Sequence, residues 1–378
     1  MRKANTRAIL LGIAAPLGAL VVAAVLTAII LLLSGFNPLD TFRAFTDAVK
    51  APRTLVNTAN LMAGYYLSAV AVAIGFKMNL FNIGVEGQYK LAAMLAGAFA
   101  GSSLASNLPG PLRIVLTILV AALVGAIWSG IAGLLKVTRG VSEVISTIML
   151  NAIALSIIAY LILPSNLGVE VGTQRVRQTR PITEGGFLEG WTVAGSSSPL
   201  YSTLVLALLV GVIYAILLNR TVFGFTLKAT GLSETAAVAS GVNVKRMTIT
   251  TMLMSGAIAG IVGIPQLLNG SDHAFSAQNF PGAIGFTGIA IALLGRNHPI
   301  GIALAAALWS ILDASSNQIQ AIAKVPLEIV QIVQGIMVFS VVIAYELVRR
   351  YRLVAEQRAV GSALGNLKAP TTPAKAQS

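Results

Sequence analysis

The sequence is poor in the residues on which soluble enzymes and metalloproteins depend. Its 378 residues include no cysteine and only two histidines. These absences exclude a disulfide framework, a thiolate metal site, a catalytic thiol and a metal site built from several histidines. Charged residues make up 10% of the chain and hydrophobic residues 56%. Since a soluble domain carries roughly 25% charged residues, this composition excludes a soluble enzyme and predicts a membrane protein.

Common nucleotide-binding and hydrolytic motifs are absent as well. The chain has no G-x-x-x-x-G-K-[ST] phosphate loop, no H-E-x-x-H, no G-x-S-x-G and no G-x-G-x-x-G. His273 and His298 both fall at the ends of expected helices. We therefore expect no catalytic residue, metal or cofactor in this chain, and no ATP site built on a phosphate loop.

Long hydrophobic runs divide the chain into candidate membrane spans. About 20 apolar residues cross the hydrocarbon core, and helices satisfy their own backbone groups there. Candidate runs lie at residues 8–34, 57–76, 89–106, 112–135, 144–163, 200–218, 247–268, 283–295, 300–322 and 327–348. The first run is longer than the apolar part of a signal peptide. The sequence therefore predicts an all-α polytopic membrane protein of about ten transmembrane helices, of which the first is not cleaved.

The basic residues predict the orientation of this bundle. With the N-terminus inside, most of the 26 lysines and arginines fall on inside segments, among them Arg2, Lys77 and Lys136. Cytoplasmic loops carry such an excess. We expect both termini inside (N-in, C-in). The net charge of +13 then follows from topology and requires no nucleic-acid partner.

The predicted organisation is one transmembrane domain over residues 1–358. A disordered cytoplasmic tail follows at residues 359–378, which are rich in Ala, Pro, Thr and Lys. Two loops within the domain are long enough to be noted: residues 164–199 outside and residues 219–246 inside. The outside loop has no role that the sequence indicates.

Polar residues recur on one face of four expected helices. They are Asn57, Asn60, Gly64 and Ser68; Glu143, Thr147 and Asn151; Trp309, Asp313, Asn317 and Gln320; and Glu328, Gln331 and Gln334. Polar side chains are costly within a membrane and commonly line a water-filled path. Hydrogen bonds between helices would also explain single residues. We expect a polar pathway, with Asp313 as its deepest carboxylate.

A polar break interrupts the hydrophobic sequence at residues 77–88. It contains Asn79, Asn82, Glu86 and Gln88 around two glycines. Irregular backbone at membrane depth needs protein or water to cover it, and transporters use such breaks to hold polar substrates. An ordinary cytoplasmic turn is the alternative interpretation.

A short helix is expected within the inside loop. Ser233 can cap its N-terminus, Glu234 stands in its first turn, and Gly241 can end it in a left-handed turn. The residues between them are small and include Thr235, Ala236 and Ala237. A helix with so little side-chain bulk is suited to docking into a groove of a partner protein.

Four segments carry a family resemblance. They are Phe81-Asn-Ile-Gly-Val-Glu-Gly-Gln88, Glu143-Val-Ile-Ser-Thr-Ile-Met-Leu-Asn151, the Ala-Ala-x-x-x-Gly of residues 236–241, and Gly288-Ile-Ala-Ile-Ala-Leu-Leu-Gly295. On these residues the chain resembles, over about residues 55–350, the permease subunits of nucleoside and simple-sugar ABC importers. This group belongs to the ribose and branched-chain amino acid permease superfamily, and the likeness is greatest to the larger permease of bacterial nucleoside importers.

The resemblance implies a multi-pass transport subunit in the bacterial plasma membrane with several partners. These are an ATP-binding ABC subunit that holds ATP and Mg, a second homologous permease, and an extracytoplasmic substrate-binding lipoprotein. It also identifies the short inside helix as the coupling helix that docks on the ATPase. The family pattern there is Glu-Ala-Ala-x-x-x-Gly, and its Glu position falls on Thr235, with Glu234 one residue earlier. Which polar residue contacts the ATPase is therefore left open.

We predict that the chain imports nucleosides by alternating access, driven by ATP at partner subunits. The predicted substrate-pathway residues are Asn79, Phe81, Asn82, Glu86, Gln88, Glu143, Asn151 and Asp313, among which Phe81 could stack on a base. The predicted coupling residues are Ser233, Glu234, Thr235, Ala236, Ala237 and Gly241. Three alternatives stay open: a permease for ribose-like sugars, an ion-coupled secondary transporter, and a membrane scaffold without transport.

Overall fold

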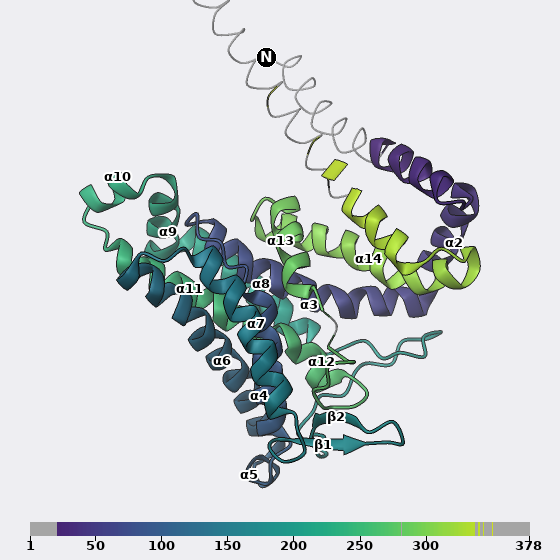
Figure 1. The fold of residues 1–378 in the computed structure, drawn as a ribbon, viewed down its shortest axis with the longest axis horizontal. Coiled ribbons are helices and arrows are strands. Elements are labelled where there is room, and N and C mark those ends of the chain that lie inside the picture. The colour runs from purple at the N-terminus through teal and green to yellow at the C-terminus, as the bar shows by residue number, and fades with distance from the viewer. Residues whose placement is uncertain (1–20, 281, 337–338, 341–342, 344–349, 351–378) are drawn as a thin grey trace, which may run out of the picture. The chain divides into compact units, whose positions relative to one another are not determined.

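The computed structural model describes residues 21–280, 282–336, 339–340, 343 and 350, and these are mostly helical (Figure 1). The helices are α2 (Pro38–Lys50), α3 (Pro52–Phe76), α4 (Val85–Ala100), α5 (Ser103–Ser106), α6 (Gly110–Arg139), α7 (Glu143–Leu161), α8 (Leu204–Arg220), α9 (Val222–Leu232), α10 (Glu234–Ala239), α11 (Val244–Gly260), the 3-10 helix η1 (Ile261–Gly263), α12 (Ile264–Asn269), α13 (Ile284–Leu294) and α14 (Pro299–Ala323). The strands are β1 (Gly168–Val171) and β2 (Val176–Thr179). Two further apolar helices, Val21–Leu33 and Leu327–Ile336, come before and after these elements in the sequence.

The chain divides into two compact units. One consists of Met1–Thr41 with Val325–Ser378, and the other is Phe42–Lys324. The larger unit contains every element from α3 to α14. It therefore holds the polar break, the predicted coupling helix and Asp313.

Each predicted hydrophobic run overlaps a helix, but fewer helices are long enough to cross a membrane. By length and composition five qualify among the described residues: α3, α6, α7, the stretch Val244–Asn269 and α14. Helices α8 and α9 would form a sixth span bent by 71°. The chain is thus a multi-pass membrane protein, whereas ten crossings and the N-in, C-in orientation stay predictions. The predicted tail at 359–378 lies outside the described residues.

The loop at 164–199, predicted to lie outside, contains a β-hairpin, so the all-α prediction is wrong at this point. Strands β1 and β2 pair antiparallel, with Gly168 opposite Thr179 and Val171 opposite Val176. Hydropathy gave no sign of the hairpin because each strand has only four residues and carries exposed polar side chains.

Hydrogen bonds fix the same loop onto the body of the larger unit. The Ile182 amide donates to the carbonyl oxygen of His273 at 2.9 Å. Arg113, a buried residue of α6, donates to Thr183 Oγ1 at 2.6 Å and to the Glu184 carbonyl at 2.7 Å. The hairpin lies at the end of the α4, α6 and α7 bundle opposite to α10 (Figure 1).

Helices α6 and α11 meet through glycines. A Cβ atom on Gly125 would lie 2.2 Å from the carbonyl oxygen of Gly256 and 2.7 Å from Cα of Gly260. Small residues at a crossing let helix backbones approach closely in membrane proteins. This contact brings α11 close enough for its polar residues to reach the turn between α3 and α4.

Replacing Gly125 by alanine should lower the free energy of unfolding by about 1–3 kcal/mol, because the new methyl group meets backbone atoms that cannot rotate away. Gly130 of the same helix provides a matched control. A Cβ atom there would lie 2.8 Å from Cδ2 of Leu253, the end of a flexible side chain. The measurement is thermal unfolding of the two purified variants in detergent. An equal loss in Gly130→Ala would contradict a special role for the glycine crossing.

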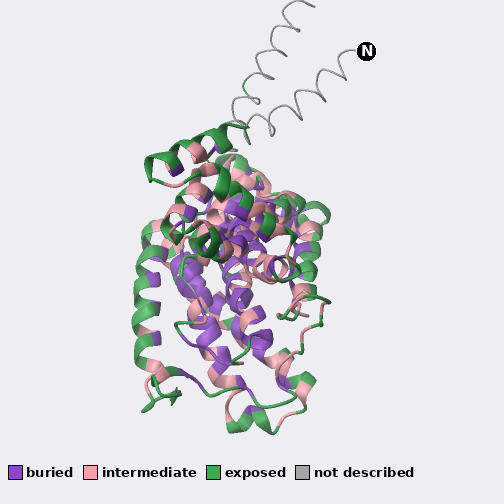
Figure 2. Cartoon of the chain, turned by 90° about the vertical axis from the view of Figure 1, so that its right-hand side faces the viewer, coloured by how far each residue is buried: buried purple, intermediate pink, exposed green. Residues whose placement is uncertain are grey.

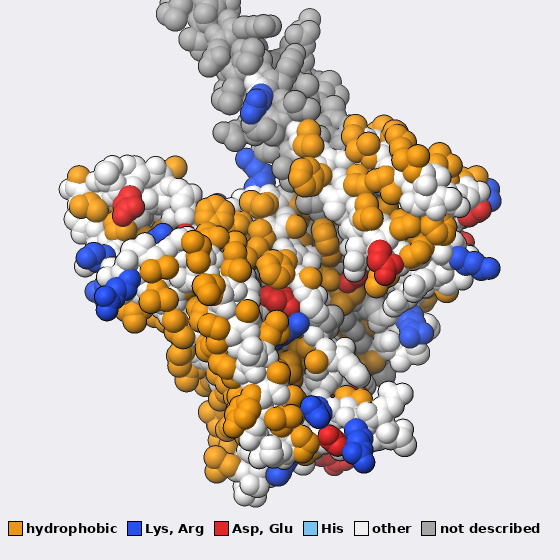
Figure 3. Space-filling view, viewed as in Figure 1, with side chains coloured by type: hydrophobic (Ala, Val, Ile, Leu, Met, Phe, Trp, Pro, Cys, Tyr) orange, Lys and Arg blue, Asp and Glu red, His pale blue; other side chains and the backbone are white. Residues whose placement is uncertain are grey.

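Burial differs between the inner and outer helices. Within the most apolar 18-residue stretch of each helix, 67% is buried inside the protein in α3 but only 22% in α6. Figure 2 shows buried residues concentrated on the inner helices and exposed residues along the outer ones. Hydrophobic side chains cover much of the outward surface in Figure 3, while lysines and arginines gather near α10 and near the hairpin. Such apolar outward faces suit contact with lipid or with another membrane subunit.

Candidate functional site

The polar break forms a tight turn between α3 and α4. The turn consists of residues 77–84, between Phe76, the last residue of α3, and Val85, the first residue of α4, so residues 85–88 of the break belong to α4. Asn79 has a φ of 55°, in the left-handed region that asparagine tolerates better than most residues. A Cβ atom on Gly75 would lie 2.8 Å from the Leu80 carbonyl oxygen, so the chain can fold back on α3 because that position has no side chain.

Asn82 of the turn bonds to Gln88 in the first turn of α4 and to α11. Asn82 donates to Oε1 of Gln88 at 2.9 Å and accepts from its Nε2 at 2.8 Å. Asn82 also donates to Ser255 Oγ at 2.8 Å, and that hydroxyl donates to the Ala71 carbonyl at 2.6 Å. Both amides are 1% exposed. A buried network whose members all have partners makes the surrounding structure rigid, so this network fixes the turn against α3 and α11.

Asn151 of α7 binds the turn from the other side. Its Oδ1 accepts from the Gly87 amide at 2.9 Å and its Nδ2 donates to the Ile83 carbonyl at 3.0 Å. Gly87 stands in the first turn of α4, where amides lack partners within the helix. A Cβ atom on Gly87 would lie 2.9 Å from Cα of Asn151. The side chain of Asn151 thus satisfies backbone groups that the irregular turn leaves free.

Glu86 connects α4 to the beginning of α13. Its carboxylate accepts from the Ala283 amide at 3.0 Å and from the Gly285 amide at 2.9 Å. Lys90, one turn later in α4, lies 3.0 Å from the same carboxylate. A negative charge at a helix N-terminus is favourable because the free amides and the helix dipole both attract it. The 5% exposed Glu86 is therefore neutralised and bonded within the chain.

Glu143, the first residue of α7, holds the middle of the turn. Its Oε1 accepts from the Phe81 amide at 3.3 Å, and its Oε2 lies 2.5 Å from Nζ of Lys136. Glu143 is 5% exposed. The predicted shared face of Glu143 and Asn151 is confirmed, because both side chains reach the same turn.

Seven of the eight predicted pathway residues lie at this turn. Asn79 and Phe81 belong to it, and Asn82, Glu86, Gln88, Glu143 and Asn151 connect it and the beginning of α4 to neighbouring segments. Their hydrogen bonds within the chain hold its backbone, and contact with a substrate stays a prediction. Phe81 is 47% exposed, and its ring meets that of Phe76 edge-on with centroids 5.1 Å apart. Stacking of Phe81 on a base likewise stays a prediction.

Asp313 lies apart from the turn, midway along α14. It accepts a hydrogen bond from the hydroxyl of Tyr65, midway along α3, at 2.7 Å. Tyr65 is 9% exposed, and Asp313 is partly exposed. A carboxylate in the middle of a membrane-spanning helix is a functional candidate by default, because its desolvation is costly.

Sequence reasoning missed Tyr65, Ser255 and the two lysines that pair with the glutamates. The Glu86–Lys90 pair could have been found, since a four-residue step brings both side chains to one helix face. Tyr65 and Ser255 gave no signal, because single polar groups in apolar helices are common and their partners lie far away in the sequence.

The short helix predicted within residues 219–246 is present as α10, while its location inside stays a prediction. Ser233 caps α10 by accepting from the Ala236 amide at 3.3 Å. Gly241, just beyond the helix, has a φ of 83°. Ala237 is 3% exposed, so it packs against its own chain and does not present its side chain outward. The exposed residues of α10 are Glu234, Thr235, Ala236, Val238 and Ala239.

Positive charge accumulates near α10. Burial lowers the pKa of Lys77, and the nearby charges of Lys228 and Arg296 lower it further. Lys77 follows the last residue of α3, and Lys228 belongs to α9. These cations lie at the end of the unit where the turn meets the last turn of α9, which leads into α10.

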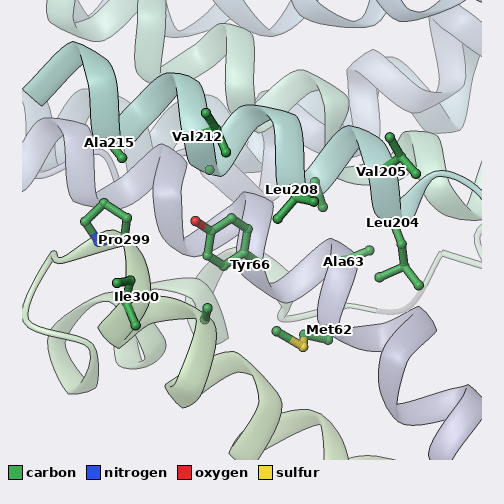
Figure 4. Close-up of a pocket in the computed structure, with 13 residues that line it drawn as sticks. Met62, Ala63, Tyr66, Leu204, Val205, Leu208, Val212, Ala215, Pro299 and Ile300 are labelled. Carbon is green, nitrogen blue, oxygen red and sulfur yellow. The ribbon is translucent and has the colours of Figure 1, made fainter.

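An apolar pocket of about 520 Å³ lies between α3, α8 and α14 (Figure 4). Its lining includes Met62, Leu208, Val212 and Ile300, and Tyr66 brings a hydroxyl to it. Sites for polar small molecules need several convergent polar groups, so this pocket does not suit a sugar or nucleoside.

Comparison with known proteins identifies the family. The family described as "Branched-chain amino acid transport system / permease component" matches residues 54–342. The chain is 33% identical over 335 residues to the guanosine ABC transporter permease protein NupP of Bacillus subtilis (strain 168), covering 87% of this chain and 93% of that protein. It is 34% identical over 336 residues to the nucleoside ABC transporter permease protein NupB of Lactococcus lactis subsp. cremoris (strain MG1363), covering 87% and 90%.

A relative of lower sequence identity is named for a sugar substrate. The glucose ABC transporter permease protein TsgB13 of Haloferax volcanii is 29% identical over 325 residues, covering 84% of this chain and 83% of that protein. No solved structure matches the chain significantly. Because the family match covers most of the chain, and two relatives above 30% identity are covered almost completely, this chain belongs to the branched-chain amino acid transport system / permease component family.

Proposed function

We propose that this chain is the transmembrane permease subunit of an ATP-driven ABC importer for nucleosides, located in the bacterial plasma membrane. The observation that carries the proposal is the similarity, over most of both chains, to two relatives named as guanosine and nucleoside permeases. ATP and Mg are then held by a separate ABC ATPase, and the chain acts with a second permease and an extracytoplasmic substrate-binding lipoprotein. The chain itself is not an enzyme in this proposal.

Within the proposed transporter, Asp313 is our preferred substrate contact. Its carboxylate lies midway along α14, a helix long enough to cross the membrane. Transporters commonly bind their substrates near the middle of the membrane. Tyr65 donates to one carboxylate oxygen, which orients the group. No hydrogen bond from the described residues to the other carboxylate oxygen is present, so that oxygen can accept one from a substrate. A carboxylate oxygen is a suitable acceptor for a ribose hydroxyl or a base N–H group.

The exposed side of α10 is the proposed docking surface for the ATPase. Its short, mostly small residues fit into a groove on a partner subunit. The polar turn at the same end of the unit then receives the movement of α10.

A sugar permease is the second candidate, because of the similarity to the glucose permease TsgB13. Uptake of labelled guanosine and uridine by cells with and without this chain separates the two, with unlabelled ribose and glucose as competitors. The proposal expects nucleoside uptake to be lost on deletion and the sugars to leave uptake unchanged. Unchanged nucleoside uptake, in cells without another nucleoside route, would overturn the proposal in favour of a sugar substrate.

A further inference from the structure

A single side chain connects the polar turn to the segment that leads into α10. The Nδ2 atom of Asn79 donates to the carbonyl oxygen of Gly231 at 2.6 Å. The two residues are 152 positions apart in the sequence. Gly231 lies in the last turn of α9, and Ser233, two residues later, caps α10.

The backbones touch at the same place. A Cβ atom on Gly231 would lie 2.2 Å from the Lys77 carbonyl oxygen and 3.0 Å from Cα of Met78. The end of α9 therefore presses directly on the first residues of the turn. Because no side chain fits between the two segments, their backbones are in contact, and a shift of α9 and α10 toward the unit must displace the turn.

The hydrogen bonds described above join the turn to α7 and α11, and they join the first turn of α4, which follows it directly, to α13. Glu143 of α7 bonds to the Phe81 amide, Ser255 of α11 bonds to Asn82, and Glu86 bonds to the first amides of α13. A displacement at Asn79 is thus passed to α7 and α11 through the turn, and to α13 through the beginning of α4.

We propose that Asn79 is a coupling residue, which transmits movement of α10 to the polar turn, and that it does not contact the substrate. The inference rests on the proposed function, because it assumes an ATPase that moves α10. Backbone contact alone can only push, whereas the Asn79 hydrogen bond can also pull. Both directions are needed if the permease alternates between two states.

Asparagine meets two requirements at this position. The φ of 55° is accessible to glycine, asparagine and aspartate at little cost. Only asparagine among these has a side chain that donates to a carbonyl oxygen, since an ionised aspartate only accepts. Asn79→Asp therefore preserves shape and backbone while removing the donor, and Asn79→Gly preserves the backbone while removing the side chain.

The test uses the complete transporter in proteoliposomes, with both permeases, the ATPase, the binding protein and labelled guanosine. Nucleoside imported per ATP hydrolysed is measured for Asn79→Asp, Asn79→Gly and the control Asn219→Asp. Asn219 is an exposed asparagine whose amide donates to the Ala215 carbonyl of its own helix, at 3.0 Å. We expect both Asn79 variants to import about five-fold less per ATP, which corresponds to about 1 kcal/mol, with ATP hydrolysis within about two-fold of the wild type.

The control is expected to keep the wild-type ratio. Wild-type coupling in Asn79→Gly would overturn the inference, and so would an equal loss of coupling in Asn219→Asp. If Asn79→Asp does not assemble, the glycine variant alone decides. A wild-type complex that imports no nucleoside would refute the proposed function instead, so the two failures are distinguishable.

Discussion

Replacing Val238 by arginine should reduce transport about 10- to 100-fold while leaving the permease folded. Val238 is 57% exposed on α10, on the surface proposed to enter a groove of the ATPase. A charged side chain without a partner in such an interface costs roughly 2 kcal/mol or more, and each 1.4 kcal/mol corresponds to about ten-fold in affinity. The measurements are copurification of the ATPase with the permease and guanosine import by the reconstituted complex.

Val222 provides the matched control for this substitution. It is 80% exposed at the beginning of α9, outside the proposed docking surface. We expect Val222→Arg to copurify with the ATPase and to transport at close to the wild-type rate. Normal ATPase binding by Val238→Arg would contradict the docking role of α10.

Ala237, the neighbouring predicted coupling residue, is unsuited to the same substitution. Arginine at Ala237 would disrupt the packing of α10 on its own chain, because Ala237 is 3% exposed. Loss of transport in Ala237→Arg would therefore not distinguish a damaged helix from a blocked interface. Val238 avoids this ambiguity, since its side chain points away from the core.

Replacing Glu86 by alanine should lower the free energy of unfolding by about 3–5 kcal/mol, because removing one partner of a buried ion pair leaves the other uncompensated. The Lys90 side chain, which is only 16% exposed, then keeps its charge without this carboxylate partner. The amides of Ala283 and Gly285 also lose their acceptor, and α13 loses the negative charge at its N-terminus. The measurement is thermal unfolding of the purified permease in detergent, read together with its yield.

A double substitution separates the effect of charge from that of packing. Glu86→Gln with Lys90→Met keeps the approximate volume of both side chains and removes both charges. We expect it to be more stable than Glu86→Ala, because no charge is left buried without a partner. If Glu86→Ala were as stable as the wild type, the carboxylate would not be the connection between α4 and α13.

The sequence predicted the positions of the helices and of the polar turn well, for a simple physical reason. Apolar runs mark buried or membrane-spanning helices, and a cluster of amides and carboxylates between two such runs marks their interruption. The four-residue steps that join Glu143, Thr147 and Asn151 predicted one polar face. Glu143 and Asn151 do bond to the same turn in the structure.

The partners of these side chains could not be predicted. Glu86 bonds to the amide of Gly285, 199 positions away, and Asn82 bonds to Ser255, 173 positions away. Such pairs depend on how the helices pack, which a local pattern does not contain. The sequence also could not predict which residue of α10 is buried, because a run of small residues does not indicate which helix face lies against the rest of the chain.

The most direct test of the central claim is import of guanosine by proteoliposomes that contain this chain, a second permease and the ATPase, with MgATP inside. The binding protein and labelled guanosine are supplied outside, and an ATPase inactive in hydrolysis is the control. We expect guanosine to accumulate only with hydrolysable ATP, also in the presence of an uncoupler, and to the same extent with excess ribose. Accumulation without ATP that an uncoupler abolishes would contradict the account and identify an ion-coupled transporter instead.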